Sequence, residues 1–99
     1  NKASRMVSAY RIKDKKKGFE CDLTVEDMIQ IMNQPCVYCG DTHRIGCDRI
    51  DNNKGHIILN VVPCCVECNK ARNDNFSFEE MKVIGRTIRE VKQSRLNNL

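Results

Sequence analysis

The sequence predicts a small α+β domain in which a β-hairpin and a short helix, joined by cysteines, are flanked by N-terminal and C-terminal helices. Two Cys-x-x-Cys pairs bracket two β-rich runs, and apolar patterns with helical spacing lie outside the pairs. A chain of 99 residues has a thin apolar core and forms one domain at most. We expect this one domain to have three consecutive parts, residues 1–35, 36–74 and 75–99.

The N-terminal part is predicted to contain a short basic helix, a strand and a second helix. Over residues 3–10, the helix face that contains Ala3 and Tyr10 is apolar. Residues 19–23 alternate between apolar and polar side chains, as a short strand does. Thr24 and Asp27 resemble a capping box, with Asp in place of the usual Glu, and Pro35 ends the helix that follows. The apolar stripe of this second helix is Val25, Met28, Ile29 and Met32.

The remainder is predicted to be a hairpin followed by two helices. Residues 46–50 and 57–62 are β-rich, and the turn-forming residues between them favour a hairpin with a longish loop. A short helix follows over about residues 66–73. Ser77 and Glu80 form a capping box for the last helix. Its apolar stripe is Met81, Ile84, Ile88 and Val91, and its basic residues, Lys92 among them, are assigned to the outer surface.

Seven cysteines indicate a metal site rather than a disulfide framework. An odd number cannot pair completely within one chain, and two Cys-x-x-Cys pairs about 25 residues apart have the spacing of a tetrahedral zinc site. We therefore expect one structural zinc per chain, held by Cys36, Cys39, Cys65 and Cys68. Cys21, Cys47 and Cys64 are expected to be small, buried apolar residues. Because zinc thiolates persist in reducing compartments, an intracellular location is expected.

The charge of the chain permits binding to nucleic acid. There are 17 Lys and Arg residues against 13 Asp and Glu, a net charge of +4, and five of the positive charges fall within residues 11–17. This basic segment is either a phosphate-binding surface or a solvated turn. No run approaches the roughly 20 apolar residues of a membrane helix, and no secretory leader is expected at the N-terminus. We therefore expect neither a membrane-spanning nor a lipid-anchored protein.

Three strings within residues 36–73 carry a resemblance to a known family. They are Cys36-Val-Tyr-Cys-Gly40, Cys47-Asp-Arg-Ile-Asp-Asn-Asn-Lys-Gly55 and Asn60-Val-Val-Pro-Cys-Cys-Val-Glu-Cys-Asn-Lys-Ala-Arg72. Together they resemble the HNH endonucleases, also called ββα-metal or His-Me finger nucleases, in their zinc-stapled phage-type branch. The resemblance implies a zinc-stapled ββα-metal core and metal-dependent hydrolysis of DNA phosphodiester bonds.

The same resemblance implies a set of active-site residues. The family's metal-binding Asp corresponds to Asp48, and its last metal ligand, a His or Asn, corresponds to Asn69. These two oxygen donors would hold one catalytic Mg²⁺ or Mn²⁺ at the scissile phosphate. The family's central Asn corresponds to Asn60, whose side-chain amide would tie the hairpin loop together.

One position departs from the family pattern. The residue after the metal-binding Asp is ordinarily the His that activates water, and here it is Arg49. Because arginine stays protonated, Arg49 is expected to bind phosphate and stabilise transition-state charge rather than act as a general base. His56 is the first candidate for the base, because it closes the hairpin loop where the family often has Tyr. Asp51 and His43 are the other candidate residues, and the remaining alternative is that the metal-bound water itself supplies the nucleophile without a side-chain base.

The predicted partner is DNA, contacted mainly through its phosphate backbone with weak sequence specificity, by a monomer or a homodimer. The residues expected to contact nucleic acid are Lys13, Lys15, Lys16, Lys17, Arg49, Lys54, Lys70 and Arg72. The alternative is a non-catalytic zinc-containing nucleic-acid-binding module on the same scaffold, which Arg49 in place of the base keeps open. A zinc ribbon for protein contacts does not account for Asp48 and Asn69.

Overall fold

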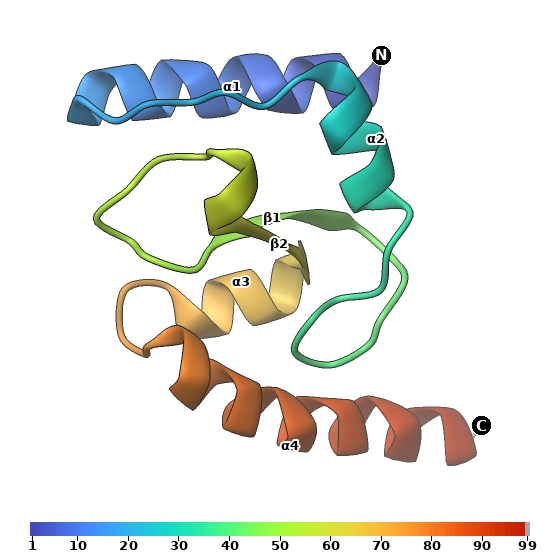
Figure 1. The fold of residues 1–99 in the computed structure, drawn as a ribbon. Coiled ribbons are helices and arrows are strands. Elements are labelled where there is room, and N and C mark those ends of the chain that lie inside the picture. Colours follow the sequence, from blue (N-terminus) through green and yellow to red (C-terminus); the bar gives the residue numbers. More distant parts are fainter. Residues whose placement is uncertain (99) are drawn as a thin grey trace.

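A computed structural model describes residues 1–98, which form four α-helices around a two-stranded antiparallel sheet. The helix α1 and the helix α4 lie on opposite sides of the hairpin and of the short helix α3 (Figure 1). In chain order the elements are α1 (Lys2–Lys17), α2 (Val25–Met32), β1 (Ile45–Arg49), the 3-10 turn η1 (Ile58–Asn60), β2 (Val61–Cys65), α3 (Val66–Arg72) and α4 (Phe78–Asn97). The predicted α+β class is confirmed.

The helix α1 is longer than predicted, because the lysine run continues the helix instead of forming a turn. Lysine is a good helix former, and three positive charges in the last turn complement the negative end of the helix dipole. Gly18, at φ 75°, then ends the helix in the left-handed conformation, and its N–H bonds back to Asp14 O and Lys15 O. The predicted strand over residues 19–23 is wrong: this segment is extended but does not join the sheet.

The hairpin pairs Ile45 with Cys65 and Asp48 with Val62. Its second strand begins later than predicted, because residues 58–60 close the loop as a 3-10 turn before the strand starts. The strand β2 ends at Cys65. The Cys65 side chain then caps the N-terminus of α3 by accepting a hydrogen bond from the Cys68 N–H. This register places the second cysteine pair directly at the junction of strand and helix.

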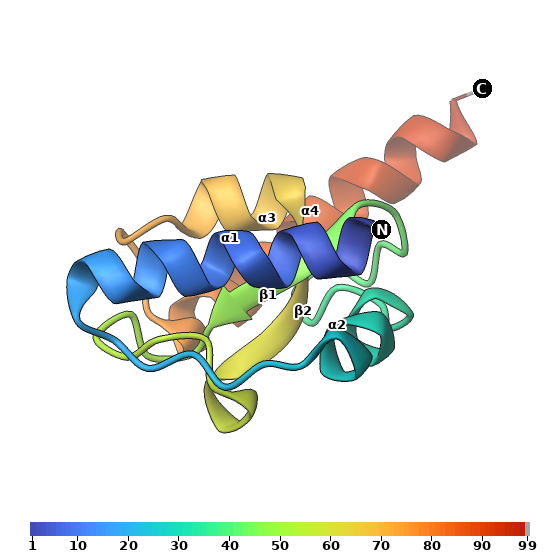
Figure 2. The same ribbon diagram turned by 90° about the horizontal axis from the view of Figure 1, so that it is seen from above.

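The two predicted capping boxes are confirmed, at Thr24 for α2 and at Ser77 for α4. The predicted stripe of α2 needs a correction, since Met28 and Ile31 are buried while Ile29 is exposed. In α4, Met81 is buried but Val91 is 46% exposed. The reason is visible in Figure 2, where the C-terminal part of α4 projects beyond the other elements.

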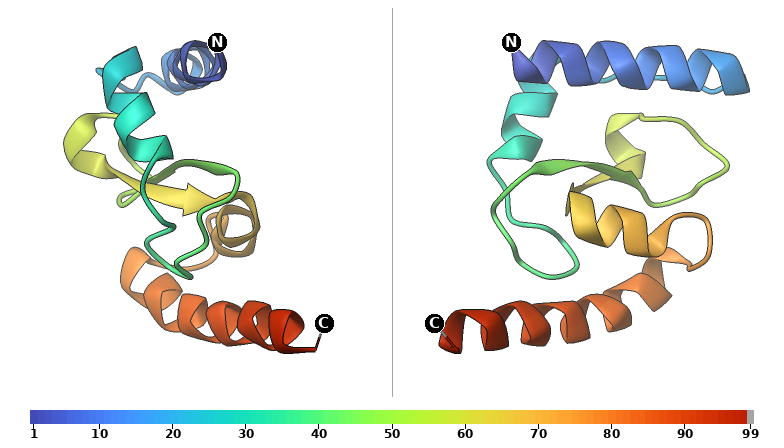
Figure 3. Two further views of the ribbon diagram at one scale, coloured as in Figure 1. Left: turned by 90° about the vertical axis from the view of Figure 1, so that its right-hand side faces the viewer. Right: turned by 180° about the vertical axis from the view of Figure 1, so that it is seen from behind.

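The hairpin loop lies against α1 and the segment that follows it, as the side views in Figure 3 show. A Cβ atom at Gly55 would lie 2.0 Å from the backbone oxygen of Glu20, so only glycine permits this approach. The contact is held by two carboxylates, because Asp14 accepts from the His56 N–H at 2.8 Å and Asp22 accepts from the Ile58 N–H at 2.9 Å. Within residues 1–98, no helix is both long and apolar enough to cross a bilayer.

Candidate active site

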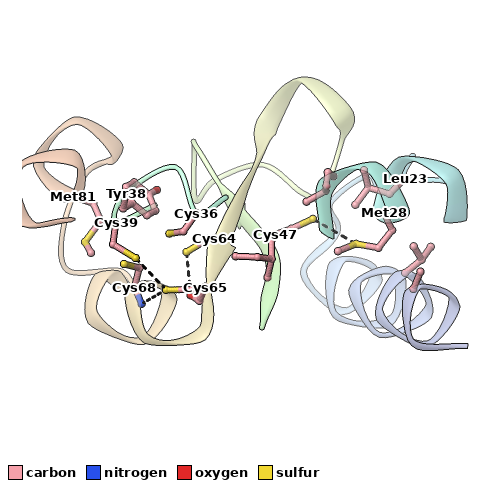
Figure 4. Close-up of a cluster of buried hydrophobic side chains, with 14 residues drawn as sticks. Leu23, Met28, Cys36, Tyr38, Cys39, Cys47, Cys64, Cys65, Cys68 and Met81 are labelled. Atoms are coloured by element: carbon pink, nitrogen blue, oxygen red, sulfur yellow. Dashed lines mark hydrogen bonds between the residues drawn. The ribbon is translucent and has the colours of Figure 1, made fainter. Parts of the chain in front are cut away.

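The four predicted cysteines meet at one point in the core (Figure 4). Cys36 and Cys39 come from the loop after α2, Cys65 ends β2, and Cys68 lies in the first turn of α3. All four are buried, and their sulfur atoms lie within 4.8 Å of one another. The Cys39 and Cys65 sulfurs are 3.7 Å apart, close to the roughly 3.8 Å edge of a tetrahedron with zinc–sulfur bonds of about 2.3 Å. The donor set therefore fits a structural zinc ion.

The other cysteines are placed largely as predicted. Cys47 and Cys64 are buried and Cys21 is half-buried. Burial raises the pKa of the Cys47 thiol to about 12, so this residue behaves as a packing group. Cys64 contacts the cluster from outside: hydrogen bonds from Cys64 and Cys68 hold the pKa of Cys36 below its usual value.

Lys92 lies against the cysteine cluster rather than on the outer surface assigned to it from the sequence. Its Nζ is 3.5 Å from the sulfur atoms of both Cys39 and Cys65. It also forms ion pairs with Asp41 at 2.9 Å and Glu67 at 3.0 Å. Burial alone would lower the pKa of Lys92, but the hydrogen bonds to the two carboxylates raise it above the usual range. The helix α4 thus places a positive charge beside the sulfur atoms of the cluster.

Asp48 is 6% exposed and lies in β1, where two side chains from different segments bind the same carboxylate oxygen. The Tyr38 hydroxyl and the Arg72 Nη1 both donate to Asp48 Oδ2, the latter at 2.7 Å. Burial and the hydrogen bond to Asp48 raise the pKa of Tyr38, so the hydroxyl stays a donor. Both contacts hold the carboxylate through Oδ2, and Asp48 also lines the adjoining cavity.

Arg72 is the clearest correction to the sequence-based assignments. The prediction that it contacts nucleic acid is wrong, because the residue is 2% exposed and its donors are bound within the chain. Besides Asp48, it donates to Arg49 O, to Ile50 O at 2.9 Å and to Phe76 O at 3.0 Å. Burial would lower its pKa, but the hydrogen bond and the charge of Asp48 outweigh burial and raise it. Arg72 is a structural cation.

One polar cavity of about 280 Å³ contains most of the predicted chemistry. Asp48, Arg49, His56 and Asn69 all line it, although they come from three different elements, the strand β1, the hairpin loop and the helix α3. The helix α1 adds Tyr10, Lys13, Asp14 and Lys17 to the same walls. Asn69 is exposed, as a ligand that also meets solvent or substrate must be. The cavity therefore joins two candidate metal ligands with a candidate base and with basic side chains.

Asn60 is buried and holds the hairpin loop through its side-chain amide, as the resemblance implies. Its Oδ1 accepts from the Asp51 N–H at 2.9 Å, and its Nδ2 donates to Asp51 O at 3.1 Å and Gly55 O at 3.0 Å. The structure places Asn60 in the loop, outside the lining of the cavity. Its contribution is to the shape of the loop that carries His56.

The two alternative bases do not lie in this cavity. The Asp51 carboxylate accepts from the Asn53 N–H at 2.9 Å within the loop. The His43 ring is exposed and pairs with Asp41 beside the cysteine cluster, where both line a different cavity. Of the three candidates, His56 alone is brought to Asp48 and Asn69.

Arg49 also has a structural contact that its sequence position did not indicate. Its Nη1 donates to Asn52 O at 3.3 Å and Lys54 O at 3.0 Å, and the guanidinium lies 5.8 Å from the centre of the Phe19 ring. It therefore helps to close the hairpin loop while one side of the group lines the cavity.

The other predicted nucleic-acid contacts are surface residues. Lys13, Lys15, Lys16 and Lys17 are exposed along the C-terminal half of α1, and Lys54 and Lys70 are exposed on the hairpin loop and on α3. Their exposure is compatible with phosphate contacts.

His56 and Asp14 form a buried pair that unites α1 with the hairpin loop. The His56 Nδ1 lies 3.0 Å from both carboxylate oxygens of Asp14, and the imidazole stacks on the Tyr10 ring with centroids 4.1 Å apart. Burial lowers the pKa of His56, against the opposing effect of Asp14, and so favours the neutral ring. Sequence reasoning missed Asp14, which is the one acidic residue within the basic segment.

Comparison with known proteins identifies the fold. No protein-family model matches the chain. The solved structure of PacI, a rare-cutting HNH restriction endonuclease, has a TM-score of 0.81 to this chain, with 23% identity, 95% of this chain covered and 81% of that chain. An uncharacterized protein of Acanthamoeba polyphaga mimivirus is 32% identical over 78 residues, which are 75% of this chain and 15% of that protein. The chain therefore has the fold of an HNH endonuclease and spans a small part of the viral protein's length.

Removal of Arg72 is expected to destabilise the protein strongly. Arg72→Ala leaves the Asp48 charge buried without its partner, which typically costs about 3–5 kcal/mol. The free energy of unfolding in urea, measured at a fixed zinc concentration, checks this. The control is Lys70→Ala on the same helix, whose exposed side chain should change stability by less than about 0.5 kcal/mol. A loss for Arg72→Ala as small as that of the control would contradict the structural role.

Proposed function

We propose that this chain is a metal-dependent endonuclease of the HNH type that hydrolyses DNA phosphodiester bonds. The observation that carries the proposal is the shared cavity of Asp48, Asn69 and His56 on a fold like that of PacI. Two oxygen donors, a neutral imidazole and basic side chains are what metal-assisted phosphodiester hydrolysis requires. We place the DNA backbone across this cavity, with Lys13 and Lys17 on one wall.

The chemistry of the donors supports a Mg²⁺ or Mn²⁺ site at Asp48 and Asn69. A carboxylate oxygen and an amide oxygen are hard ligands, and the remaining positions of such an ion are commonly filled by water and phosphate. When bound there, the ion supplies positive charge to the scissile phosphate and to the leaving 3′ oxygen. Arg49 adds a fixed positive charge to the same cavity and cannot itself accept a proton.

The four cysteines serve a structural zinc in this proposal. Such a closed tetrathiolate site has no open position for substrate, so its contribution is to folding. The second candidate function, a nucleic-acid-binding module without catalysis, is favoured by one observation. The Nη1 of Arg49, the residue that replaces the usual base, is bound to loop carbonyls. The experiments below separate the two functions.

Zinc content and folding should change together. We expect one zinc per chain by metal analysis, and we expect a chelator that removes it to unfold the domain, because the thin core depends on the metal. The Cys64→Ser variant is the control, since Cys64 lies outside the group of four and should leave the zinc content at one. Metal-free protein with an unchanged circular dichroism spectrum would contradict a structural zinc.

Plasmid nicking with Mg²⁺, Mn²⁺ or EDTA tests the catalytic site. Asn69→Ala should abolish cleavage without loss of stability, since Asn69 is exposed. At Asp48 the informative variant is Asp48→Asn, which removes the charge but retains an oxygen for Tyr38 and Arg72. Asp51→Asn, outside the cavity, should cleave like the natural chain. DNA binding without cleavage by the natural chain, in every metal, would favour the binding module.

The lysine run should determine affinity for the DNA backbone. Replacement of Lys15, Lys16 and Lys17 together by Ala should weaken binding similarly on unrelated sequences. It should also reduce the slope of log affinity against log salt by roughly one unit per lost contact. The control is Lys82→Ala, a partly buried lysine on α4 that pairs with Glu79. Unchanged affinity and slope in the triple variant would show that the run is only a solvated surface.

A further inference from the structure

Asp14 makes more contacts with His56 than are needed to attach the hairpin loop to α1. Asp14 is 1% exposed and accepts from both the backbone N–H and the ring nitrogen of His56. The ring is held on one face by Tyr10, whose own hydroxyl accepts from the Cys47 N–H at 3.0 Å. Both the position and the rotation of the imidazole are therefore fixed.

The contact also determines where the imidazole proton lies. A carboxylate only accepts hydrogen bonds, so its position 3.0 Å from Nδ1 assigns the proton to Nδ1. The lone pair of the neutral ring is then on Nε2. His56 and Asp14 line the cavity that Asp48 and Asn69 also line, so the imidazole that carries this lone pair belongs to the same site.

A comparison within the chain separates this arrangement from an ordinary loop anchor. Asp22 also holds the hairpin loop, through the Ile58 N–H at 2.9 Å, but it is exposed and lies outside the cavity. It binds backbone alone, whereas Asp14 binds an ionisable ring as well. Of these two loop-anchoring carboxylates, only Asp14 also holds a candidate base.

We infer that Asp14 is a positioning residue that holds His56 as the water-activating base of the active site. The inference rests on the proposed endonuclease function. As the water oxygen bonds to phosphorus, His56 Nε2 takes a proton from that water and the bond from phosphorus to the 3′ oxygen breaks. The leaving oxygen takes a proton from solvent, which gives a 3′-hydroxyl and a 5′-phosphate, and the imidazolium later returns its proton to solvent. Asp14 stabilises the imidazolium formed in between.

Several charged groups surround this ring and bear on its pH dependence. From α1, Asp14 favours the protonated form, while Lys13 disfavours it and Tyr10 stacks without charge. From β1, Arg49 disfavours the protonated form. Lys17, Asp48 and Asp74 line the same cavity. Removal of the Asp14 charge should therefore lower the pKa of His56 and make the ring a weaker base.

The test is the rate of plasmid nicking at saturating protein and metal, measured from pH 5 to pH 9 on the full chain. His56→Gln should lower the plateau rate about a hundredfold or more, the usual worth of a general base, and should remove the fall in rate on the acid side. Asp14→Asn should lower the plateau by roughly tenfold or more and move the acid limb to lower pH. Asp22→Asn should keep both the plateau and the limb, and all three variants should bind DNA like the natural chain.

A measurement without catalysis checks the same geometry. Nitrogen NMR of the ring in the natural chain should show His56 protonated at Nδ1 at pH 8. A ring protonated at Nε2 would overturn the inference. If the natural chain cleaves DNA and His56→Gln cleaves it equally fast, His56 is not the base. If Asp14→Asn matches Asp22→Asn in rate and in the position of the acid limb, Asp14 only anchors the loop and is not a positioning residue. Absence of cleavage by the natural chain with Mg²⁺ and Mn²⁺ would overturn the endonuclease itself, together with this inference.

Discussion

The buried ion pair between Arg72 and Asp48 is the interaction on which the geometry of the candidate site depends. A guanidinium taken out of water must have its donors bound, and Arg72 meets this demand with carbonyls at the end of β1, in the following loop and before α4. One side chain thus joins the hairpin, α3 and the entry to α4. It also fixes the rotation of Asp48, because its Nη1 binds a single carboxylate oxygen. The orientation of the Asp48 carboxylate is therefore set by Arg72 and Tyr38, within the chain, rather than by a ligand.

The cysteine cluster is coupled to this pair through Tyr38. Tyr38 lies between Cys36 and Cys39, so the turn that brings the two sulfur atoms together also sets the position of the hydroxyl that donates to Asp48. The helix α4 braces the same turn: a Cβ atom at Gly85 would lie 2.5 Å from the Tyr38 carbonyl oxygen. A metal ion bound by the four cysteines would therefore act on the candidate site indirectly, because it would hold the turn that positions Asp48.

Local features were predictable from the sequence because their signals are local. The capping boxes at Thr24 and Ser77 and the two Cys-x-x-Cys pairs are spaced by three residues, which the chain geometry converts directly into contacts. The functions of Arg72 and Lys92 were not predictable in this way, since their partners lie 24 and 53 residues away. In the sequence both are basic residues on a short or amphipathic helix, which normally lie in solvent. Only the tertiary fold shows that each is enclosed by oxygen or sulfur acceptors.

The helix α1 shows how an element outside the ββα core becomes part of its site. Ala3, Val7, Tyr10, Asp14 and Lys17 recur at intervals of three and four residues and so share one face of the helix. The N-terminal half of this face is apolar and belongs to the core, and the C-terminal half lines the cavity. Tyr10, with an apolar ring and a hydrogen-bonded hydroxyl, marks the change. A polar residue that continues an apolar helical stripe is thus the signal that identifies Asp14. The length of α1 also matters for the site, because a helix that ended at Tyr10 would leave the cavity without Asp14 and Lys17.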